Sequence, residues 1–105
     1  MKNLTDLMKQ AGQMQARMAD MQKKLEGLTV EGQSGGGLVK VTMTGKSVVT
    51  AIEIDPSLLK PDEKEIVEDL LIAALADAKS KAEGLMAEEM KVVTGGMPIP
   101  PGFSF

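Results

Sequence analysis

The chain has no cysteine, histidine, tryptophan or tyrosine, and only two phenylalanines among its 105 residues. Without cysteine and histidine there are no thiol nucleophiles, no serine–histidine–aspartate triads and few possible ligands for zinc. Disulfide bonds are excluded as well, which agrees with a reducing compartment. Because single-strand and RNA-recognition modules stack bases on aromatic side chains, the scarcity of aromatics also argues against those modes of binding.

Long apolar runs and an excess of basic residues are missing too. No segment approaches the ~18 consecutive apolar residues of a membrane-spanning helix, and no secretory signal segment follows the charged start. We therefore expect a cytoplasmic protein that does not enter the membrane. The 12 basic and 15 acidic residues give a net charge of −3. Since DNA-binding domains are usually strongly basic, composition alone gives little support to nucleic-acid binding.

The charges are distributed unevenly along the chain. Residues 1–26 carry five basic side chains against three acidic ones, whereas residues 62–105 carry four against nine. The basic residues of the first segment are the candidates for contacts with phosphate groups: Lys2, Lys9, Arg17, Lys23 and Lys24. A plain solvated helix face fits their spacing equally well, and Asp6 and Asp20 dilute their charge.

An apolar ladder with steps of three and four residues runs through the same segment and predicts a helix from about Leu4 to Gly27. Its members are Leu4, Leu7, Ala11, Met14, Met18, Met21, Leu25 and Leu28. Such a narrow stripe is typical of a seam for another helix. Four heptads span about 36 Å, more than the ~25–30 Å diameter of a domain of this length. The helix should therefore extend beyond its domain and pair with a partner, either within the chain or in a second copy.

The middle of the chain changes to the period of two that indicates β-strands. Residues 29–34, 38–44 and 48–54 predict three strands, with a glycine-rich loop at 35–37. The side chains expected on the buried face are Val39, Val41, Met43, Val48, Thr50, Ile52 and Ile54. We expect a turn of the glycine-first type at Gly45-Lys46, and proline ends the third strand at position 56.

A second, longer helix is predicted to begin with a capping box, Asp62-x-x-Glu65, and to reach about Val92. Its apolar face is wider than that of the first helix, and we expect this face to pack on the sheet. It consists of Ile66, Val67, Leu70, Leu71, Ala74, Ala78, Ala82, Leu85 and Met86. Gly95-Gly96 ends the helix, and the proline-rich residues that follow predict an extended tail.

The predicted fold class is therefore α+β, with an α-β-β-β-α order, a three-stranded antiparallel meander and two long helices. Within a single domain, 1–105, the expected boundaries are 1–27 for the first helix, 28–55 for the sheet, 62–93 for the second helix and 94–105 for the Gly/Pro tail. One face of such a sheet and at least one strand edge stay open. A homodimer with projecting helices would close them economically.

Other motifs are better explained by structure than by chemistry. Gly45-Lys46-Ser47 resembles the end of a phosphate-binding loop, but Lys40 stands where that loop needs glycine and no helix follows. The acidic residues at 62–65 suit a helix N-terminus, and Glu88-Glu89 suits a solvated helix face. The nine methionines fit either packing or an adaptable binding surface. We therefore expect no enzymatic activity, cofactor, metal or small-molecule substrate.

Several segments together resemble the YbaB/EbfC family of nucleoid-associated proteins. They are Gly36-Gly37-Leu38-Val39-Lys40-Val41-Thr42, Gly45-Lys46, Ile52-Glu53-Ile54-Asp55-Pro56-Ser57-Leu58-Leu59, the Met/Gln-rich first helix and Gly95-Gly96-Met97-Pro98-Ile99-Pro100-Pro101-Gly102-Phe103. The resemblance covers essentially the whole chain. It implies a bacterial homodimer of the cytoplasm and nucleoid, whose long helices project tweezer-like from a central sheet. It also implies DNA binding without catalysis, with effects on DNA shape, nucleoid organisation and gene expression.

Our hypothesis from the sequence is a homodimer that binds double-stranded DNA, largely through phosphate contacts from the basic residues of the first helix. Two helices that flank a duplex could supply about four to eight such contacts. The main alternative is a protein-interaction module that uses the apolar seam, the methionines and the proline-rich tail. An enzyme or small-molecule carrier is disfavoured because histidine, cysteine and tyrosine are absent.

Overall fold

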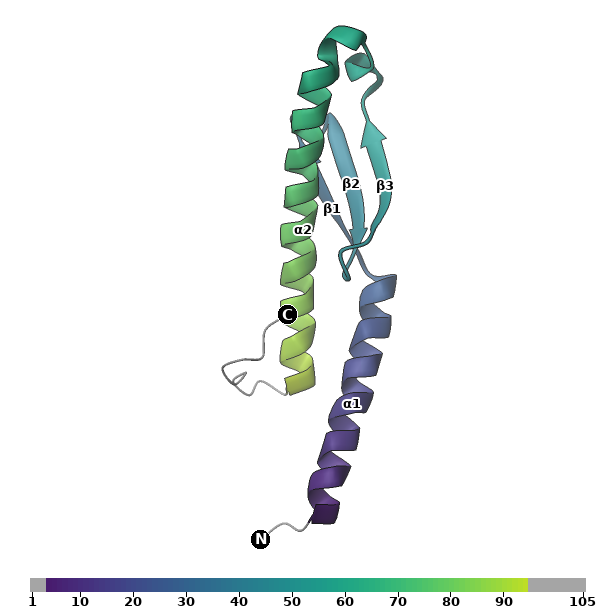
Figure 1. Ribbon diagram of the computed structural model, residues 1–105, viewed down its shortest axis with the longest axis vertical. Coiled ribbons are helices and arrows are strands. Elements are labelled where there is room, and N and C mark those ends of the chain that lie inside the picture. Colours follow the sequence, from purple (N-terminus) through teal and green to yellow (C-terminus); the bar gives the residue numbers. More distant parts are fainter. Residues whose placement is uncertain (1–3, 95–105) are drawn as a thin grey trace.

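The computed structural model describes residues 4–94, which form two helices and one antiparallel sheet (Figure 1). Helix α1 spans Leu4–Gly27 and helix α2 spans Lys64–Thr94. The strands, in their order across the sheet, are β1 (Thr29–Ser34), β2 (Val39–Thr44) and β3 (Val49–Ile54). The predicted α+β class and α-β-β-β-α order are confirmed. The tail predicted at 94–105 lies outside the described residues, except for the last residue of α2.

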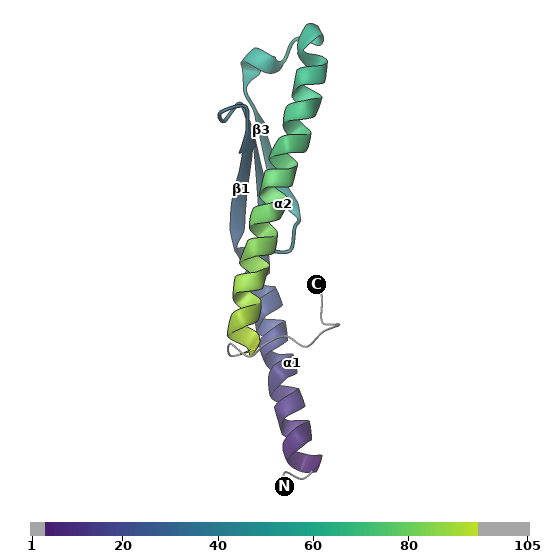
Figure 2. The ribbon, with the colours of Figure 1, turned by 90° about the vertical axis from the view of Figure 1, so that its left-hand side faces the viewer.

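The molecule is elongated and measures 70 × 25 × 17 Å. α2 lies along the sheet, whereas α1 continues past the end of the sheet, so that its first half projects alone (Figures 1 and 2). The expectation that the first helix extends beyond the rest of the domain is thus confirmed. In the described part of the chain, neither helix is long and apolar enough to cross a membrane.

The core lies between α2 and the first two strands. β2 is the central strand and buries Val39, Val41 and Met43 against α2. The helix presents a stripe of small, fully buried side chains to the sheet, namely Ala74, Ala78 and Ala82. Val67, Leu70 and Leu71 pack around this stripe, so most of the predicted apolar face of α2 does lie on the sheet.

A close approach of α2 to β1 explains why residue 32 is glycine. A Cβ atom at Gly32 would overlap the carbonyl oxygen of Ala74 and the amide nitrogen of Ala78, and would lie 2.6 Å from the Ala78 Cβ. Glycine on the strand and alanine on the helix therefore let the two backbones come together. Ser34 also stabilises the contact between β1 and α2, because its Oγ donates a hydrogen bond to the Leu70 carbonyl oxygen at 2.6 Å.

β3 departs from the predicted pattern at its start. Val49 pairs with Met43, where the register of the rest of the strand would place Thr50, and the extra residue forms a β-bulge. Val48 lies in the preceding turn and is 57% exposed. The expectation that Val48 and Thr50 alternate onto the buried face is therefore wrong, because the bulge breaks the period of two.

The rest of β3 keeps the predicted alternation, and Ile54 packs against the core, but α2 leaves Ile52 largely uncovered. Ile52 pairs with Val41 and Ile54 pairs with Val39, so both isoleucines belong to the face on which α2 packs. Ile52 is nevertheless 48% exposed, because α2 lies over β1 and β2. An apolar strip of the sheet thus stays open beside the helix.

The turn between β2 and β3 is not of the glycine-first type that the sequence predicted. Its left-handed residue is Ser47 (φ 65°), whose N–H donates a hydrogen bond to the Thr44 carbonyl oxygen at 2.9 Å. Gly45 is needed for packing instead, since a Cβ there would lie 2.6 Å from Cδ2 of Leu25 in α1. The glycines at 35–37 do adopt positive φ values of 62°, 68° and 99°, as their hairpin loop requires.

Two predictions for the start of α2 are wrong. Asp62 does not cap the helix, because Pro61–Glu63 form a 3₁₀ turn that Lys60 precedes and α2 begins only at Lys64. Proline imposes a helical φ one residue before the predicted cap, so the turn starts earlier. Ile66 does not pack on the sheet and is 48% exposed.

A second, smaller apolar cluster joins α1 to the end of α2. Met21 and Leu25 of α1 are buried there against Met90 and Val93 of α2. The side chains packed around them are Met18, Leu85 and Met86. Leu85 and Met86 therefore pack in the cluster that joins the two helices, not in the core beneath the sheet, where they were expected.

The apolar ladder of α1 is consequently divided. Its second half pairs with α2 inside the chain. Its first half is exposed, with accessible fractions of 72% for Leu4, 54% for Leu7 and 40% for Met14, and Ala11 is exposed as well. Leu28, just after the helix, is half-buried. Helix α2 thus covers only part of the apolar ladder, and the other part has no cover in the described chain.

Candidate nucleic-acid interface

The basic residues of α1 lie on the side of the helix that faces away from the apolar ladder. At 3.6 residues per turn, the four basic residues that the structure describes fall within an arc of about 120° around the axis of α1. The centre of the apolar ladder lies about 130° from the centre of this arc. These four are Lys9, Arg17, Lys23 and Lys24. The fifth candidate, Lys2, lies outside the described residues. Pairing along the ladder therefore leaves this basic face open to solvent.

Three of these cations are available to bind phosphate. Lys9, Arg17 and Lys23 are exposed, and none of them forms an ion pair with another residue of the described chain. Along the helix axis Arg17 lies about 12 Å from Lys9, and Lys23 lies about 9 Å further on. Lys9 is on the projecting part of α1, and Arg17 is at its base, beside the end of α2.

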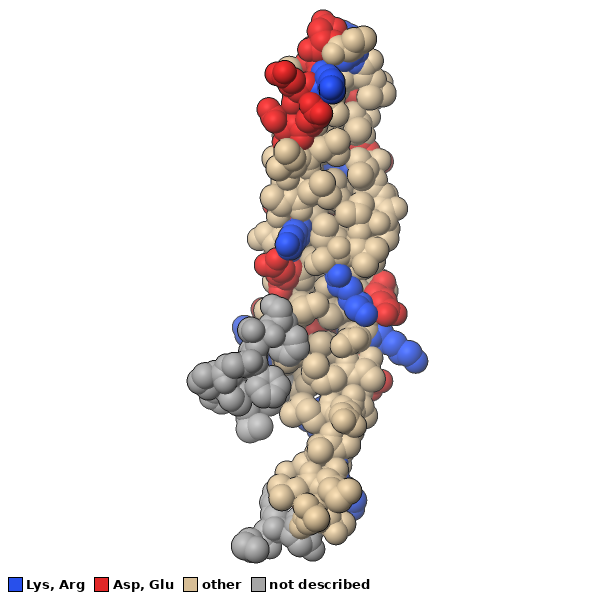
Figure 3. Space-filling model, viewed as in Figure 1, with Lys and Arg blue, Asp and Glu red and all other residues tan. Residues whose placement is uncertain are grey.

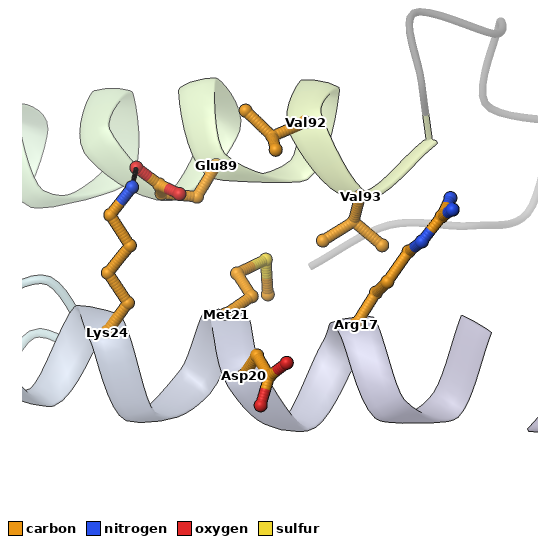
Figure 4. Close-up of a pocket in the computed structure, with 7 residues that line it drawn as sticks. All are labelled: Arg17, Asp20, Met21, Lys24, Glu89, Val92 and Val93. Atoms are coloured by element: carbon orange, nitrogen blue, oxygen red, sulfur yellow. Dashed lines mark ion pairs between the residues drawn. The ribbon is translucent and has the colours of Figure 1, made fainter. Parts of the chain in front are cut away.

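Lys24 differs because α2 supplies it with a partner. Its Nζ lies 2.9 Å from Oε1 of Glu89, whose side chain is only 13% exposed, against 56% for that of Lys24. The pair stands at one end of a cleft of 260 Å³ between the two helices, and Arg17 stands at the other end (Figure 4). Asp20 also lines this cleft. The two helices thus bring two cations and two carboxylates together.

The position of Glu89 corrects an interpretation made from the sequence. Glu88 is a solvated residue with 72% exposure, but Glu89 is mostly covered. The sequence did contain an indication that Glu89 is covered. Glu89 lies one helical turn from both Leu85 and Val93, and so shares the apolar face that packs in the cluster between the helices. Its partner Lys24 is far away in sequence, and no local pattern identifies it.

Other charged contacts stabilise the body of the fold. Lys81 donates to the Glu31 carbonyl oxygen at 2.8 Å and pairs with Asp77 at 3.2 Å. The pKa of Asp77 lies below its ordinary value, first because the Gln33 N–H donates to its carboxylate at 3.0 Å and then because Lys81 hydrogen-bonds to it. Among residues 4–94, no group of three or more acidic residues is arranged to hold a metal ion.

Acidic residues gather at the opposite end of the molecule from the start of α1. The 3₁₀ turn before α2 and the first turns of that helix carry Asp62, Glu63, Glu65, Glu68 and Asp69. They form a patch at the top of the view in Figure 3 in which acidic side chains outnumber the basic ones among them. The uneven charge along the sequence therefore becomes a separation of charge along the long axis, which would orient α1 toward a polyanion.

The surface between α2 and β3 is nearly free of charge (Figure 3). Val49 and Ile52 of β3 are 40% and 48% exposed. Beside the turn after β2, a groove of 620 Å³ runs along α2, and its lining mixes Met86 and Met90 with the charged side chains of Lys79, Glu83 and Lys91. Exposed apolar side chains that lie side by side in this way are typical of contact surfaces between macromolecules.

Comparisons with known proteins identify the family. The model of the YbaB/EbfC DNA-binding family matches residues 1–97. The chain belongs to the YbaB/EbfC DNA-binding family. It is 55% identical over 105 residues to a nucleoid-associated protein of Gluconacetobacter diazotrophicus, with 100% of this chain and 98% of that protein covered. A nucleoid-associated protein of a Bradyrhizobium species is 56% identical over 105 residues, with 100% and 99% covered.

A solved structure has the same YbaB/EbfC-like fold. An uncharacterized protein from Helicobacter pylori superposes with a TM-score of 0.71 and covers 92% of this chain and 98% of its own, at 24% identity. At that identity the likeness concerns the fold alone. The family resemblance seen in the sequence is confirmed, whereas the DNA-contacting residues of this YbaB/EbfC protein stay predictions.

Proposed function

We propose that this YbaB/EbfC protein is a non-enzymatic homodimer that binds double-stranded DNA mainly through phosphate contacts from α1. In this proposal it acts in the bacterial cytoplasm, on the nucleoid, and influences DNA conformation, nucleoid organisation and gene expression. The observation that carries the proposal is an exposed basic face on a helix that projects from the body of the molecule. Family membership supports DNA as the ligand.

Contacts with phosphate groups suit the side chains that this face offers. Lys9, Arg17 and Lys23 are long, exposed cations, and residues of these types contact the DNA backbone without reading sequence. Asp6 and Asp20 lie on the same side of α1 and lower its positive potential. We therefore expect moderate affinity, a steep dependence on salt and little sequence preference.

A second copy of the chain would cover the uncharged surface between α2 and β3. Val49 and Ile52 are partly exposed there, and β3 is an edge strand whose free side can accept another strand. In a symmetric dimer, each copy would bury this same surface against the other copy. Two α1 helices would then reach the same duplex, and the second contact would strengthen the first through effective concentration.

Fluorescence anisotropy of a labelled duplex tests the mechanism. With about four to eight phosphate contacts per dimer, affinity should fall by about 10² to 10⁴ between roughly 50 and 200 mM salt. An unrelated duplex of equal length should bind nearly as well. Sedimentation equilibrium of the same sample should give the mass of two chains. No binding at the lower salt would contradict the proposed DNA contacts, and the mass of one chain would contradict the dimer.

The exposed half of the apolar ladder favours one alternative, a protein-interaction module. Leu4 and Leu7 are more than half exposed in the described chain, and a helix of a partner protein could pack on them. A protein partner that co-purifies in stoichiometric amount after nuclease treatment, together with a Leu4→Ser/Leu7→Ser variant that loses it, would support this alternative. Loss of the partner on nuclease treatment would leave DNA as the ligand.

A further inference from the structure

Lys24 differs from the other basic residues of α1 because its charge is already engaged. Its Nζ lies 2.9 Å from Oε1 of Glu89, whereas Lys9 and Arg17 form no ion pair within the described chain. Lys24 nevertheless belongs to the basic face and lies about 10 Å beyond Arg17 along the helix axis. A phosphate that approaches this face therefore meets a cation that an acidic side chain already holds.

The two partners of this ion pair differ in freedom. The Glu89 side chain is 13% exposed and that of Lys24 is 56% exposed. Glu89 stands one turn from Leu85 and one turn from Val93, which both pack in the cluster that joins the helices. Lys24 extends from α1 on a flexible four-carbon chain, which can turn its ammonium group toward solvent. The carboxylate is thus fixed in the cleft, and the ammonium group can leave it.

We propose that Glu89 is an intramolecular competitor of DNA: its carboxylate holds Lys24 in the free protein, and a DNA phosphate must replace it before Lys24 joins the interface. This inference rests on the proposed function, in which the basic face of α1 binds phosphate groups. When Lys24 turns toward a phosphate, the carboxylate stays in the cleft and repels that phosphate. Glu89 therefore keeps affinity below the level that the cations of α1 would otherwise give.

The other charged groups of the cleft do not replace Glu89 in this role. Asp20 lies on α1 itself, one turn before Lys24, and Arg17 stands at the far end (Figure 4). With Glu89 present, the cleft has two cations and two carboxylates. Without the Glu89 charge, Arg17 and Lys24 face Asp20 alone, and the cleft becomes attractive to an anion.

The test compares Glu89→Gln with Glu88→Gln by anisotropy on the same labelled duplex. Both changes remove one negative charge from neighbouring positions of α2, but Glu88 is 72% exposed and lies 3.8 Å from Lys91 instead of contacting α1. Glu89→Gln should tighten binding about threefold to tenfold at low salt and steepen the salt dependence by about one phosphate contact per chain. Glu88→Gln should tighten binding less than about twofold, since its charge is exposed and screened.

A Lys24→Gln background shows whether Glu89 acts through Lys24. There the Glu89→Gln change should lose most of its benefit and resemble Glu88→Gln. Glu89→Asp is the second variant, because it keeps the charge but withdraws the carboxylate from Lys24, and it should give a smaller gain. Thermal unfolding of each variant confirms that it is folded. The gain from Glu89→Gln in the native background, and its loss in the Lys24→Gln background, would support the proposal.

Several outcomes would overturn this inference. Equal affinities for Glu89→Gln and Glu88→Gln, weaker binding by Glu89→Gln, or a full gain in the Lys24→Gln background would each show that Glu89 does not compete with DNA for Lys24. In all of these cases the unmodified protein still binds DNA, so only the inference fails. If the unmodified protein shows no salt-dependent binding, the proposed function fails and this inference fails with it.

Discussion

The body of the molecule and its arm are built in opposite ways. In the body, formed by the sheet and α2, Val39, Val41 and Ala74 are fully buried. In the arm, residues 4–17 of α1, Leu4 and Leu7 are more than half exposed. Packing therefore determines which side chains the body can have, while the arm is free to vary except where it meets a partner. We expect stability to depend on the body and binding to depend on the arm.

The largest effect on stability should come from a substitution at Gly32 in the body. A substitution at Gly12, the glycine of the arm, should change stability in the opposite direction. Gly32→Val would force a side chain into the backbone of α2 at Ala74 and Ala78, and should lower the free energy of unfolding by about 3 kcal/mol or more. A Cβ at Gly12 would meet no atom within 4 Å. Gly12→Ala should therefore raise stability by about 0.5–1 kcal/mol through helix propensity.

Urea denaturation of both glycine variants checks this contrast. The urea midpoint should fall for Gly32→Val and rise for Gly12→Ala, with similar m-values. If Gly32→Val unfolded at the same urea concentration as the unmodified protein, the close approach of α2 to β1 would be wrong.

The next largest effect on stability should come from the apolar cluster that joins α1 to α2. Leu25 is fully buried in the cluster that joins α1 to α2, so Leu25→Ala should lower the free energy of unfolding by about 2–4 kcal/mol. Leu7→Ala makes the same chemical change on the same apolar ladder, but Leu7 is 54% exposed. It should change stability by less than about 0.5 kcal/mol. A Leu7→Ala effect as large as that of Leu25→Ala would mean that the arm is packed in solution.

The smallest effect concerns the contact between Asp77 and β1. The Gln33 N–H and Lys81 lower the pKa of Asp77 below its ordinary value of 3.8. A lowered folded-state pKa means that the carboxylate stabilises the fold above its unfolded-state pKa, and that this stabilisation is lost as pH falls through the folded-state pKa. Asp77→Asn should therefore be less stable than the unmodified protein at neutral pH, and this difference should shrink as the pH falls through the folded-state pKa of Asp77.

Thermal unfolding across this pH range is the measurement, with Asp69→Asn as the control. Asp69 is an exposed carboxylate near the acidic end, and its replacement should change stability little. A constant difference between Asp77→Asn and the unmodified protein, from neutral to acid pH, would show that ionisation of Asp77 does not contribute.

The periodic features of this fold were predictable because local spacing determines them. The ladder from Leu4 gave both the bounds of α1 and its extension beyond the sheet. The features that were missed depend on contacts between distant segments. Gly45 is glycine because Leu25 packs on it, and the bulge at the start of β3 interrupts a regular alternation. The pairing of Lys24 with Glu89 likewise exists only because α1 and α2 lie side by side.

The candidate interface was predictable only in part. The basic residues of α1 could be identified from sequence, and the structure adds that Lys24 is paired while Lys9, Arg17 and Lys23 are exposed without ion pairs in the described chain. The uncharged surface beside β3 was anticipated only as an open sheet face. Its position depends on α2 covering two strands and not the third, which no local pattern encodes.

Two charge-reversed variants, compared by the salt dependence of their DNA binding, show whether α1 is the DNA-binding element. Lys9→Glu/Arg17→Glu reverses two cations of the arm, and Lys60→Glu/Lys64→Glu makes the same change at the acidic end of the body. We predict that the arm variant loses about 10²-fold or more in affinity at roughly 50 mM salt and that its salt slope falls by about two to four. The body variant should keep its slope and lose no more than about threefold. Equal losses in both variants, or an unchanged slope in the arm variant, would contradict the assignment of DNA binding to α1.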